Sequence, residues 1–274
     1  MFAASYSISP RDLWTTIGTS AAPRVIDARR HQIFAASDEL LPTAVWRDFS
    51  ALSSWCADIG RDRPIVVACK EGHELSQLVA AQLRANGFDA SVLTGGYKAW
   101  KEAGLPFVAK GTLERFAPRM PSLWVTRRRP KIDRVACPWL IKRFIDSEAR
   151  ILFVDPPEVL AVARESGGTP FDIEDVELSH RGEYCSFDTM LELFGLDAEP
   201  ALARLAVIVR GADTARPDIA PEAAGLHAIS LGLSALAGDD DRLMLERGFI
   251  IYDALFTWLR FAVQERHNWP AKVA

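Results

Sequence analysis

The segment PIVVACKEGHELSQLVAAQLRANG (residues 64–87) decides the fold of the N-terminal part of the chain. Residues 64–69 form a short apolar run rich in β-branched side chains, which is typical of a buried parallel strand. After a polar loop, residues 75–86 carry apolar side chains at helical spacing, and Gly87 follows as a helix stop. A strand, a loop and a helix in this order predict one βα unit of a parallel sheet.

The same alternation extends in both directions along the chain. Ser9 and Pro10 form a helix start, because proline is tolerated at the first helical position. Further strands are predicted at residues 24–29 and 90–95, and a further helix is predicted at 97–104. Strands that alternate with helices predict an α/β fold with a parallel sheet.

The second half of the chain is richer in helical patterns. Buried strands are predicted at 123–127 and 150–155, and a helix is predicted at 136–145 with Cys137 at its cap. From Ser186, which is predicted to cap a helix, apolar residues recur mostly at helical spacing.

A length of 274 residues predicts two domains, because single cores usually stop growing below that size. The stretch that best fits a linker mixes proline, glycine and charge without a clear period. We predict an α/β parallel-sheet domain at 1–108, a linker at 109–122, and an α-rich mixed α/β domain at 123–274.

Charge is unevenly distributed, although the formal net charge is only −4. Residues 1–108 hold 11 basic and 11 acidic residues, residues 109–150 hold 11 and 4, and residues 151–274 hold 10 and 21, which together make up the totals of 32 and 36. A basic segment beside an acidic one predicts mutual packing or a local anion site rather than a broad nucleic-acid surface. A nucleic-acid partner is therefore not expected.

The sequence also bears on the compartment. No apolar run approaches the length of a membrane span, and the start MFAASYSISPRDLW lacks the basic and apolar regions of an export signal. We expect a cytoplasmic protein without a membrane partner. Wide, irregular spacing predicts free thiols or metal ligands rather than disulfides for the four cysteines, which are Cys56, Cys69, Cys137 and Cys185.

Cys69 is the candidate nucleophile, because it lies at the carboxyl end of a predicted strand and before a helix. Backbone N–H groups at such a place favour a thiolate and hold an anion. The alternative is a buried, inert cysteine. His73 is a candidate loop base or a solvated polar residue, and Asp27 either orients the loop or ends its strand. The candidate anion-binding residues of the loop are Lys70, Gly72 and Ser76.

Three segments carry a resemblance to a known family: VIDARR (25–30), VVACKEGHELSQLVAAQLRANGF (66–88) and VLTGGYKAW (92–100). Together they resemble the rhodanese family over about the first hundred residues. The resemblance implies that Cys69 accepts sulfur from a small donor as a persulfide. The loop from Cys69 to Ser76 is longer than is usual in that family, and the family's loop arginine is absent. Weak thiosulfate sulfurtransferase activity is therefore expected.

A second resemblance covers roughly residues 123–262. It is carried by WVTRRRPKIDRVACPWLIKRFIDSEARILFVDP (124–156), PFDIEDVELSHRGEYCSFDTM (170–190), GLHAISLGLSAL (225–236) and YDALFTWLRF (252–261). These segments resemble the ChrB C-terminal domain of chromate-resistance proteins. The resemblance implies a role in resistance or response to chromate or a related oxyanion. Regulatory members have a DNA-binding N-terminal region, which the rhodanese-like segments replace here.

Two sites are predicted in this second part. His180, Glu183 and Cys185 fall within one irregular segment, and with Cys137 as a fourth partner they suit zinc or another transition metal. The alternative is that the polar residues are solvated and the cysteines are buried small hydrophobes. Asp213 and His227, in later helices, are further candidates, although a lone histidine on an apolar helix face is more often a core residue.

A basic cluster is the second predicted site, because guanidinium groups recognise oxyanions. The alternative is that the cluster pairs with the acidic segment. Its members are Arg127, Arg128, Arg129, Lys131 and Arg134. Two functional hypotheses remain open: an enzyme that uses Cys69 for sulfur transfer or thiol redox chemistry, and a non-catalytic sensor that binds a metal or an oxyanion.

Overall fold

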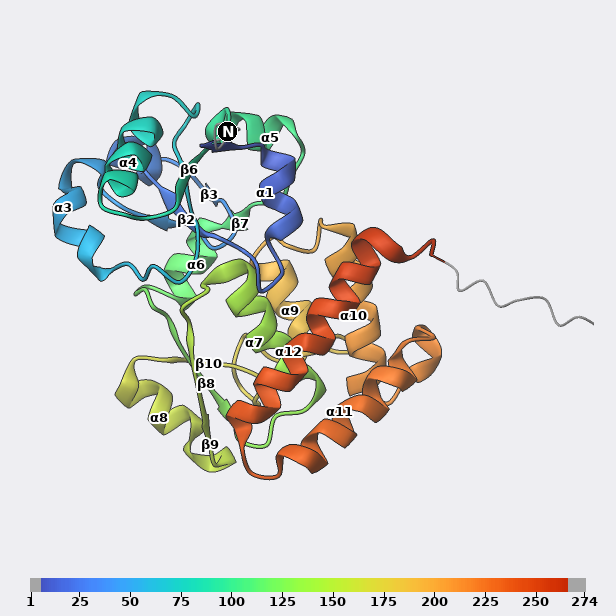
Figure 1. Ribbon diagram of the computed structural model, residues 1–274. Helices are drawn as coiled ribbons and strands as arrows, with labels where there is room; N and C mark the ends of the chain where they lie inside the picture. The colour runs from blue at the N-terminus through green and yellow to red at the C-terminus, as the bar shows by residue number, and fades with distance from the viewer. Residues whose placement is uncertain (1–5, 266–274) are drawn as a thin grey trace, which may run out of the picture.

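The computed structural model describes residues 6–265 and shows two lobes packed on one another (Figure 1). Residues 1–5, which begin the segment searched for an export signal, and residues 266–274, which end the second predicted domain, lie outside the described residues. No helix within the described range combines the length and the apolar character that a membrane span requires.

The N-terminal lobe contains the predicted parallel sheet, with strand order β1-β6-β5-β2-β4. All four side chains of β5 are buried, and Val66 at its centre lies opposite Val25 of β2 and Ser91 of β6. The central strand is therefore the apolar run that precedes Cys69. The strands are β1 (Ser7–Ile8), β2 (Arg24–Asp27), β4 (Val45–Trp46), β5 (Ile65–Ala68) and β6 (Ala90–Leu93).

Short helices surround this sheet. The side chain of Ser9 accepts a hydrogen bond from the Asp12 amide, so the predicted start of α1 is confirmed. A separate antiparallel pair joins β3 (Glu39–Leu40) to β7 (Val108–Ala109). The helical segments are α1 (Pro10–Thr16), α2 (His31–Ala35), η1 (Phe49–Ala51), α3 (Leu52–Trp55), η2 (Cys56–Asp58), α4 (Glu74–Ala85) and α5 (Gly96–Glu102).

The C-terminal lobe combines a small parallel sheet, of order β10-β8-β9, with a group of helices. The predicted strands at 123–127 and 150–155 appear as β8 and β9. The strands are β8 (Leu123–Arg127), β9 (Arg150–Val154) and β10 (Thr169–Pro170). The helical segments are α6 (Lys110–Phe116), α7 (Ile132–Leu140), η3 (Ile141–Ile145), η4 (Pro156–Glu158), α8 (Val159–Ser166), α9 (Ser186–Leu193), α10 (Pro200–Asp213), η5 (Pro217–Ile219), α11 (Ala223–Ala237), α12 (Asp241–Thr257) and η6 (Trp258–Ala262).

The segment predicted as a linker contains helix α6, whose Leu113 is buried. Two local predictions are wrong. Helix α7 begins at Ile132, so Cys137 lies inside it rather than at its cap, because the apolar periodicity of its buried face extends to both sides of Pro138. The cap of α9 is Cys185 instead of Ser186, since the Asp188 carboxylate accepts the Cys185 amide.

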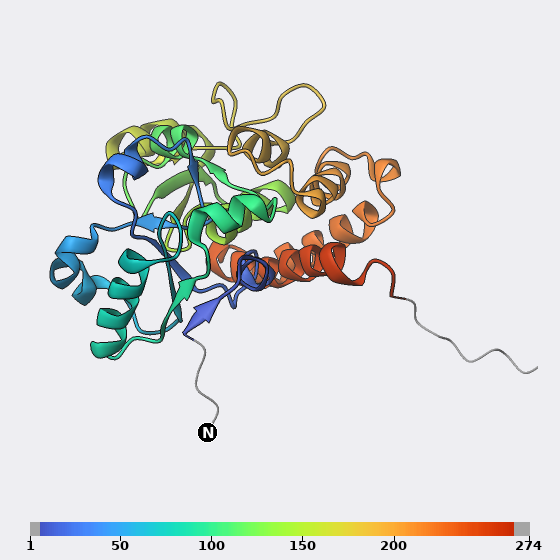
Figure 2. The same cartoon turned by 90° about the horizontal axis from the view of Figure 1, so that it is seen from above.

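One apolar core joins the two lobes. The ring of Phe144 lies 6.1 Å from that of Trp14 and 5.4 Å from that of Phe256, centroid to centroid. A Cβ at Gly18 would approach ring carbons of Phe256 and Phe144 to 2.4 and 2.7 Å, so the turn after α1 needs a glycine. Figures 1 and 2 both show α1 beside the C-terminal end of the α12–η6 helix, and the guanidinium of Arg260 in η6 donates to the Trp14 carbonyl at 2.8 Å. The boundaries of the two predicted domains stay a prediction.

Because Phe144 is fully buried in the shared core, Phe144→Ala is expected to destabilise the protein by about 3–5 kcal/mol. Both lobes should unfold together, which tryptophan fluorescence and far-UV circular dichroism during urea denaturation can measure. Leu160→Ala, at a position 44% exposed on α8, is the control and should change stability by less than about 1 kcal/mol. Two separate unfolding transitions would contradict a shared core.

Candidate metal centre and cysteine pocket

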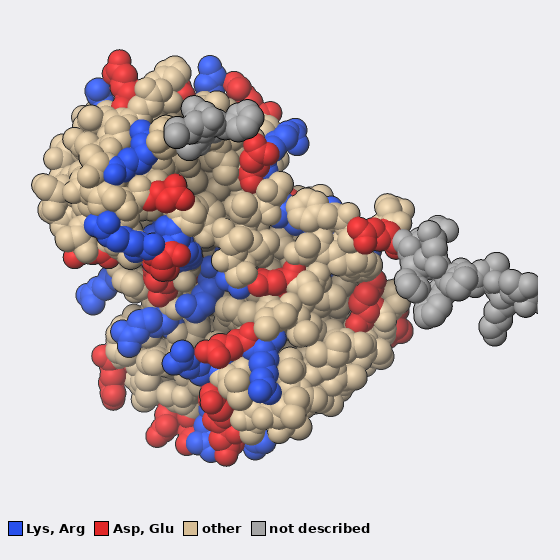
Figure 3. Space-filling view, in the orientation of Figure 1, with Lys and Arg blue, Asp and Glu red and all other residues tan. Residues whose placement is uncertain are grey.

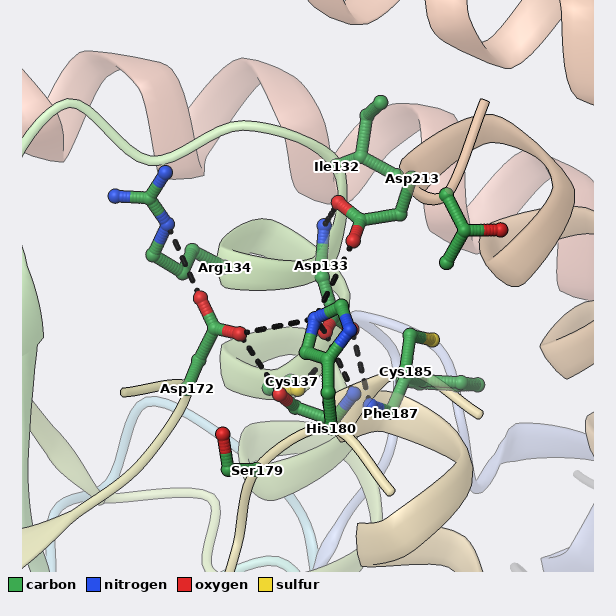
Figure 4. Close-up of polar contacts among 12 residues, drawn as sticks. Ile132, Asp133, Arg134, Cys137, Asp172, Ser179, His180, Cys185, Phe187 and Asp213 are labelled. Carbon is green, nitrogen blue, oxygen red and sulfur yellow. Dashed lines mark hydrogen bonds and ion pairs between the residues drawn. The ribbon is translucent and has the colours of Figure 1, made fainter. Parts of the chain in front are cut away.

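His180 lies among three aspartates in the C-terminal lobe (Figure 4). Its Nε2 atom is 3.4 Å from Asp133 Oδ2, 3.4 Å from Asp172 Oδ1 and 3.5 Å from Asp213 Oδ2. The side chains of Asp133 and Asp172 are 2% and 4% exposed, whereas those of Asp213 and His180 are 21% and 42% exposed. The cluster is therefore closed on the Asp133 and Asp172 side and reached by solvent from the His180 side.

Four separate elements bring these residues together. Asp133 stands in the first turn of α7, and Asp213 ends α10. Asp172 follows β10 closely, and His180 belongs to the irregular segment before α9. Because β8 leads to α7 and β10 leads to Asp172, the cluster lies beyond the carboxyl ends of parallel strands, where α/β folds usually place ligands.

Asp133 fixes the start of α9. Its Oδ2 accepts the Ser186 amide at 2.8 Å, and its Oδ1 accepts the Phe187 amide at 3.0 Å. These two amides belong to the N-terminal turn of α9, which has no internal partners for them. The Asp133 amide in turn donates to Asp213 Oδ1 at 3.3 Å. Through its carboxylate and its amide, Asp133 thus links α7, α9 and α10.

Asp172 is held from three sides. It accepts the Ser186 hydroxyl at 2.7 Å and forms ion pairs with Arg127 at 3.0 Å and Arg134 at 3.2 Å. Its backbone has a φ of 52°, in the left-handed region that aspartate tolerates better than most residues. Although burial raises the pKa of Asp172, hydrogen bonds from His180 and Ser186 and the charge of Arg127 outweigh it and lower that pKa.

The cluster shifts the pKa values of its exposed members upward. Hydrogen bonds to Asp133 and Asp172 raise the pKa of His180 to about 10. Burial, followed by the charges of Asp133 and Asp172, raises the pKa of Asp213 to about 7. At neutral pH the imidazole therefore carries a proton that offsets the crowded carboxylates. A dication in the same place would take over that role and release protons.

The donor set fits a divalent metal. One ligand atom from each of Asp133, His180 and Asp213 lies within 4.8 Å of the others. Two ligands of a tetrahedral ion, each about 2.1 Å from it, lie about 3.4 Å apart, which matches the separations around His180 Nε2. Carboxylates and an imidazole together suit zinc, manganese or iron.

Of the four predicted metal ligands, only His180 belongs to this group. The carboxylate of Glu183 is 79% exposed and pairs with Arg216 at 3.2 Å. The thiol of Cys185 lies 3.3 Å from Asp188 Oδ2, and that of Cys137 lies 3.5 Å from Asp133 Oδ1. Burial, with the charge of Asp133 next, raises the pKa of both thiols, which disfavours the thiolate that a metal needs.

Asp133 and Asp172 were not predicted from the sequence, whereas Asp213 was named as a candidate. Asp133 had a signal, because it is an acidic residue one helical turn before Cys137 on a largely apolar helix. Asp172 follows a strand too short to be predicted from its pattern. The closeness of these residues depends on tertiary packing.

The predicted basic cluster is largely paired with acidic residues. Besides the two arginines on Asp172, Arg128 lies 3.0 Å from Asp155 and Arg129 lies 3.7 Å from Asp239. Lys131 is exposed and precedes α7. Four of the five basic residues therefore pair with the acidic segment, as the alternative interpretation of the cluster predicts. This pairing reduces the positive charge that an oxyanion could meet.

In the other lobe, Cys69 lies at the base of a cavity of about 400 Å³ near the N-terminus of α4. Its Sγ is 3.1 Å from the Ser76 hydroxyl, which also donates to the His73 carbonyl at 3.1 Å. A Cβ at Gly96 would approach the Cys69 carbonyl to 2.1 Å, so the Gly-Gly pair after β6 lets the loop pack closely. Gly72, with a φ of 70°, makes the turn of the loop.

Asp27 does not contact the cysteine loop through its side chain. It pairs with Arg29 at 2.7 Å and accepts the Tyr97 hydroxyl at 3.0 Å. The Tyr97 amide donates to the Cys69 carbonyl at 3.0 Å. Asp27 therefore supports the loop through Tyr97, as an orienting residue would.

The basic residues around the cavity come from two elements. His73 and Lys70 line it from the loop, and Arg29 and Arg30 line it from the end of β2. The His73 side chain is 75% exposed and lies 3.9 Å from Glu71. Within residues 6–265, no acidic group pairs with Arg30 or Lys70. Arg30 therefore supplies a positive charge to the cavity that Cys69 lines, although the cysteine loop itself has no arginine.

These two lobes define a class of protein in which a cysteine-loop α/β unit is joined to a helix-rich unit with a carboxylate–histidine cluster. Residues 9–103 match the rhodanese-like domain, and residues 124–259 match the C-terminal domain of ChrB. The chain therefore carries a rhodanese-like domain followed by a domain of the ChrB C-terminal family, and both resemblances noted in the sequence are confirmed.

Individual proteins are similar to parts of this chain. Protein ChrB of Cupriavidus metallidurans is 37% identical over 134 residues, which are 49% of this chain and 40% of that protein. The chain thus matches two-fifths of the length of this curated relative. A protein from Staphylococcus saprophyticus is 23% identical, with a TM-score of 0.32, over 36% of this chain and 96% of its own. A rhodanese-related protein from Thermoplasma volcanium is 24% identical, with a TM-score of 0.33, over 37% of this chain and 96% of its own.

We predict that Cys69 is the first thiol to react in the folded protein, because it lines an open cavity. Cys137 and Cys185 are fully buried, and their raised pKa values keep them as thiols. Limited iodoacetamide treatment at pH 7.5, followed by peptide mass spectrometry, measures the order of labelling, and Cys69→Ser should remove the first label. Faster labelling of Cys56 or Cys137 would contradict the assignment.

Proposed function

We propose that the C-terminal domain binds a divalent transition metal through Asp133, His180 and Asp213, and that the protein acts in the response to chromate or a related oxyanion. The observation that carries the proposal is the convergence of three ligand atoms from α7, α10 and an irregular segment within 4.8 Å. The link to chromate rests on the ChrB family alone.

Each ligand has a distinct part in this proposal. Asp133 is fixed by two backbone amides and supplies a preorganised carboxylate, whereas Asp213 and His180 are exposed enough to admit an ion. Asp172 positions the imidazole and is itself neutralised by two arginines. Zinc, manganese or iron bound here would supply a Lewis acid open to solvent on one side.

Metal titration of purified protein tests this proposal. Zinc or manganese should raise the melting temperature, and His180→Gln or Asp213→Asn should weaken the affinity at least about tenfold. Glu183→Gln is the matched control in the same segment and should bind normally, because Glu183 points to Arg216. If elemental analysis finds no metal and neither ion shifts the melting temperature, the cluster is a structural ion network.

Acidity should weaken metal binding. Since the pKa of His180 is about 10 and that of Asp213 about 7 in the metal-free protein, both groups hold protons that the ion must displace near neutral pH. The affinity measured by calorimetry should therefore rise steadily from pH 6 to pH 8, with protons released on binding. A pH-independent affinity over this range would exclude His180 and Asp213 as ligands.

A second function, thiol chemistry at Cys69, is favoured by the cavity above its Sγ. In sulfur transfer, the Cys69 thiolate attacks the outer sulfur of thiosulfate, sulfite leaves with the electron pair of the broken S–S bond, and a cysteine persulfide remains for an acceptor thiol. Lys70, Arg30 and the N-terminus of α4 surround the place of the anion.

We predict weak thiosulfate sulfurtransferase activity that Cys69→Ser abolishes. The loop lacks an arginine fork, and Glu71 and Glu74 line the same cavity, so a dianionic donor is held poorly. Cyanide-dependent thiocyanate formation measures the rate, and Cys56→Ser should leave it unchanged. Turnover as fast as that of an arginine-containing rhodanese would show that the loop arginine is dispensable here.

A further inference from the structure

Helix α11 has an unusual composition for a surface helix. Its sequence, AAGLHAISLGLSALA (223–237), contains no Asp, Glu, Lys or Arg. In Figure 3, the face over α11 is a continuous area without charged side chains, whereas the left side of the molecule is densely charged. A surface helix normally places charged and polar residues toward solvent.

Helix α11 buries two serines beside Ala223 and Leu226 and exposes large apolar side chains on its other side. Ser230 and Ser234 face the protein and are 5% and 8% exposed. Ile229, Leu231 and Leu236 face solvent and are 47%, 42% and 71% exposed. Contiguous exposed apolar residues mark a surface that another molecule covers.

Two glycines in α11 have no explanation within one copy of the chain. Gly225 and Gly232 are helical and exposed, and a Cβ at either position would meet nothing within 4 Å. A glycine inside a helix costs about 0.5–1 kcal/mol relative to alanine. Close approach of a second helix accounts for both, because small residues let helix backbones come near each other.

From these features we infer that α11 pairs with α11 of a second copy of this chain, antiparallel and across a two-fold axis near Ser230. Four pairs of exposed positions are symmetric about residue 230, namely 224 and 236, 225 and 235, 228 and 232, and 229 and 231. Gly225 would face the partner's Ala235, and Ala228 would face the partner's Gly232. At the two flanks, Ile229 would meet the partner's Ile229, and Leu231 would meet the partner's Leu231. Small residues thus meet small ones and large residues meet large ones.

The absence of Asp, Glu, Lys and Arg from α11 favours a second copy of this chain as the partner. An isologous interface brings a patch against itself, so any net charge there would repel its own image, and this helix has none. An antiparallel pair also sets the positive end of each helix beside the negative end of the other. A membrane surface is disfavoured, because interfacial helices carry Lys and Arg and α11 carries neither.

Sedimentation velocity of the full chain tests this inference. Between about 1 and 200 µM, the range in which an interface of about one helix pair should associate, the mass should rise from that of a monomer to that of a dimer. Leu236→Glu should keep the chain monomeric. Gly232→Leu should do the same without lowering the melting temperature, because a side chain there meets nothing within one copy. Leu160→Glu on α8, also an exposed leucine, should dimerise normally.

Cysteine cross-linking tests the orientation. An equimolar mixture of Ala228→Cys and Gly232→Cys chains should form a disulfide dimer under mild oxidation, while either chain alone should not. A monomer at the highest concentration, a dimer that Leu236→Glu leaves intact, or binding of the monomer to phosphatidylcholine vesicles through α11 would each overturn the inference. None of these results depends on a bound metal or on Cys69.

Discussion

The Asp133 carboxylate is the interaction on which the C-terminal lobe depends. This buried carboxylate accepts hydrogen bonds from two backbone amides of α9, so it fixes the angle between α7 and α9. The backbone amide of Asp133 also holds Asp213 at the end of α10. A buried carboxylate that lost these partners would be costly. The same group therefore organises the helices and limits where His180 can lie, so stability and the candidate site cannot be separated at this residue.

The two lobes share a core but keep their polar sites apart. The ring of Phe144 packs against Trp14 of the N-terminal lobe and Phe256 of the C-terminal lobe, whereas the Asp133 cluster and the Cys69 cavity have no lining residue in common. A core of close-packed aromatic rings is rigid and supports each site without bringing them into contact. Any functional cooperation between thiol and metal therefore requires a diffusing ligand or a partner, not direct contact.

The sequence predicted the sheet of the N-terminal lobe and its cysteine loop well, because Ile65–Ala68 and Glu74–Ala85 carry strong local periodicity. It also predicted His180. It could not predict Asp133 and Asp172 as neighbours of His180, since their meeting depends on how α7 and β10 pack, and long-range packing has no local pattern. Pro138 misled the prediction of α7, because a proline inside a helix looks like a helix start.

Helix α11 connects the proposed dimer to the proposed metal site through packing. The η5 turn joins α10 to α11, and His227 Nδ1 lies 3.1 Å from the carbonyl of Ala212, the residue before Asp213. The buried side of α11 therefore contacts the end of α10 that presents a candidate ligand, while its exposed side carries the apolar face. Pairing across that face would hold the α10–α11 hairpin in one arrangement, and a ligand on a fixed hairpin binds an ion with less loss of conformational entropy.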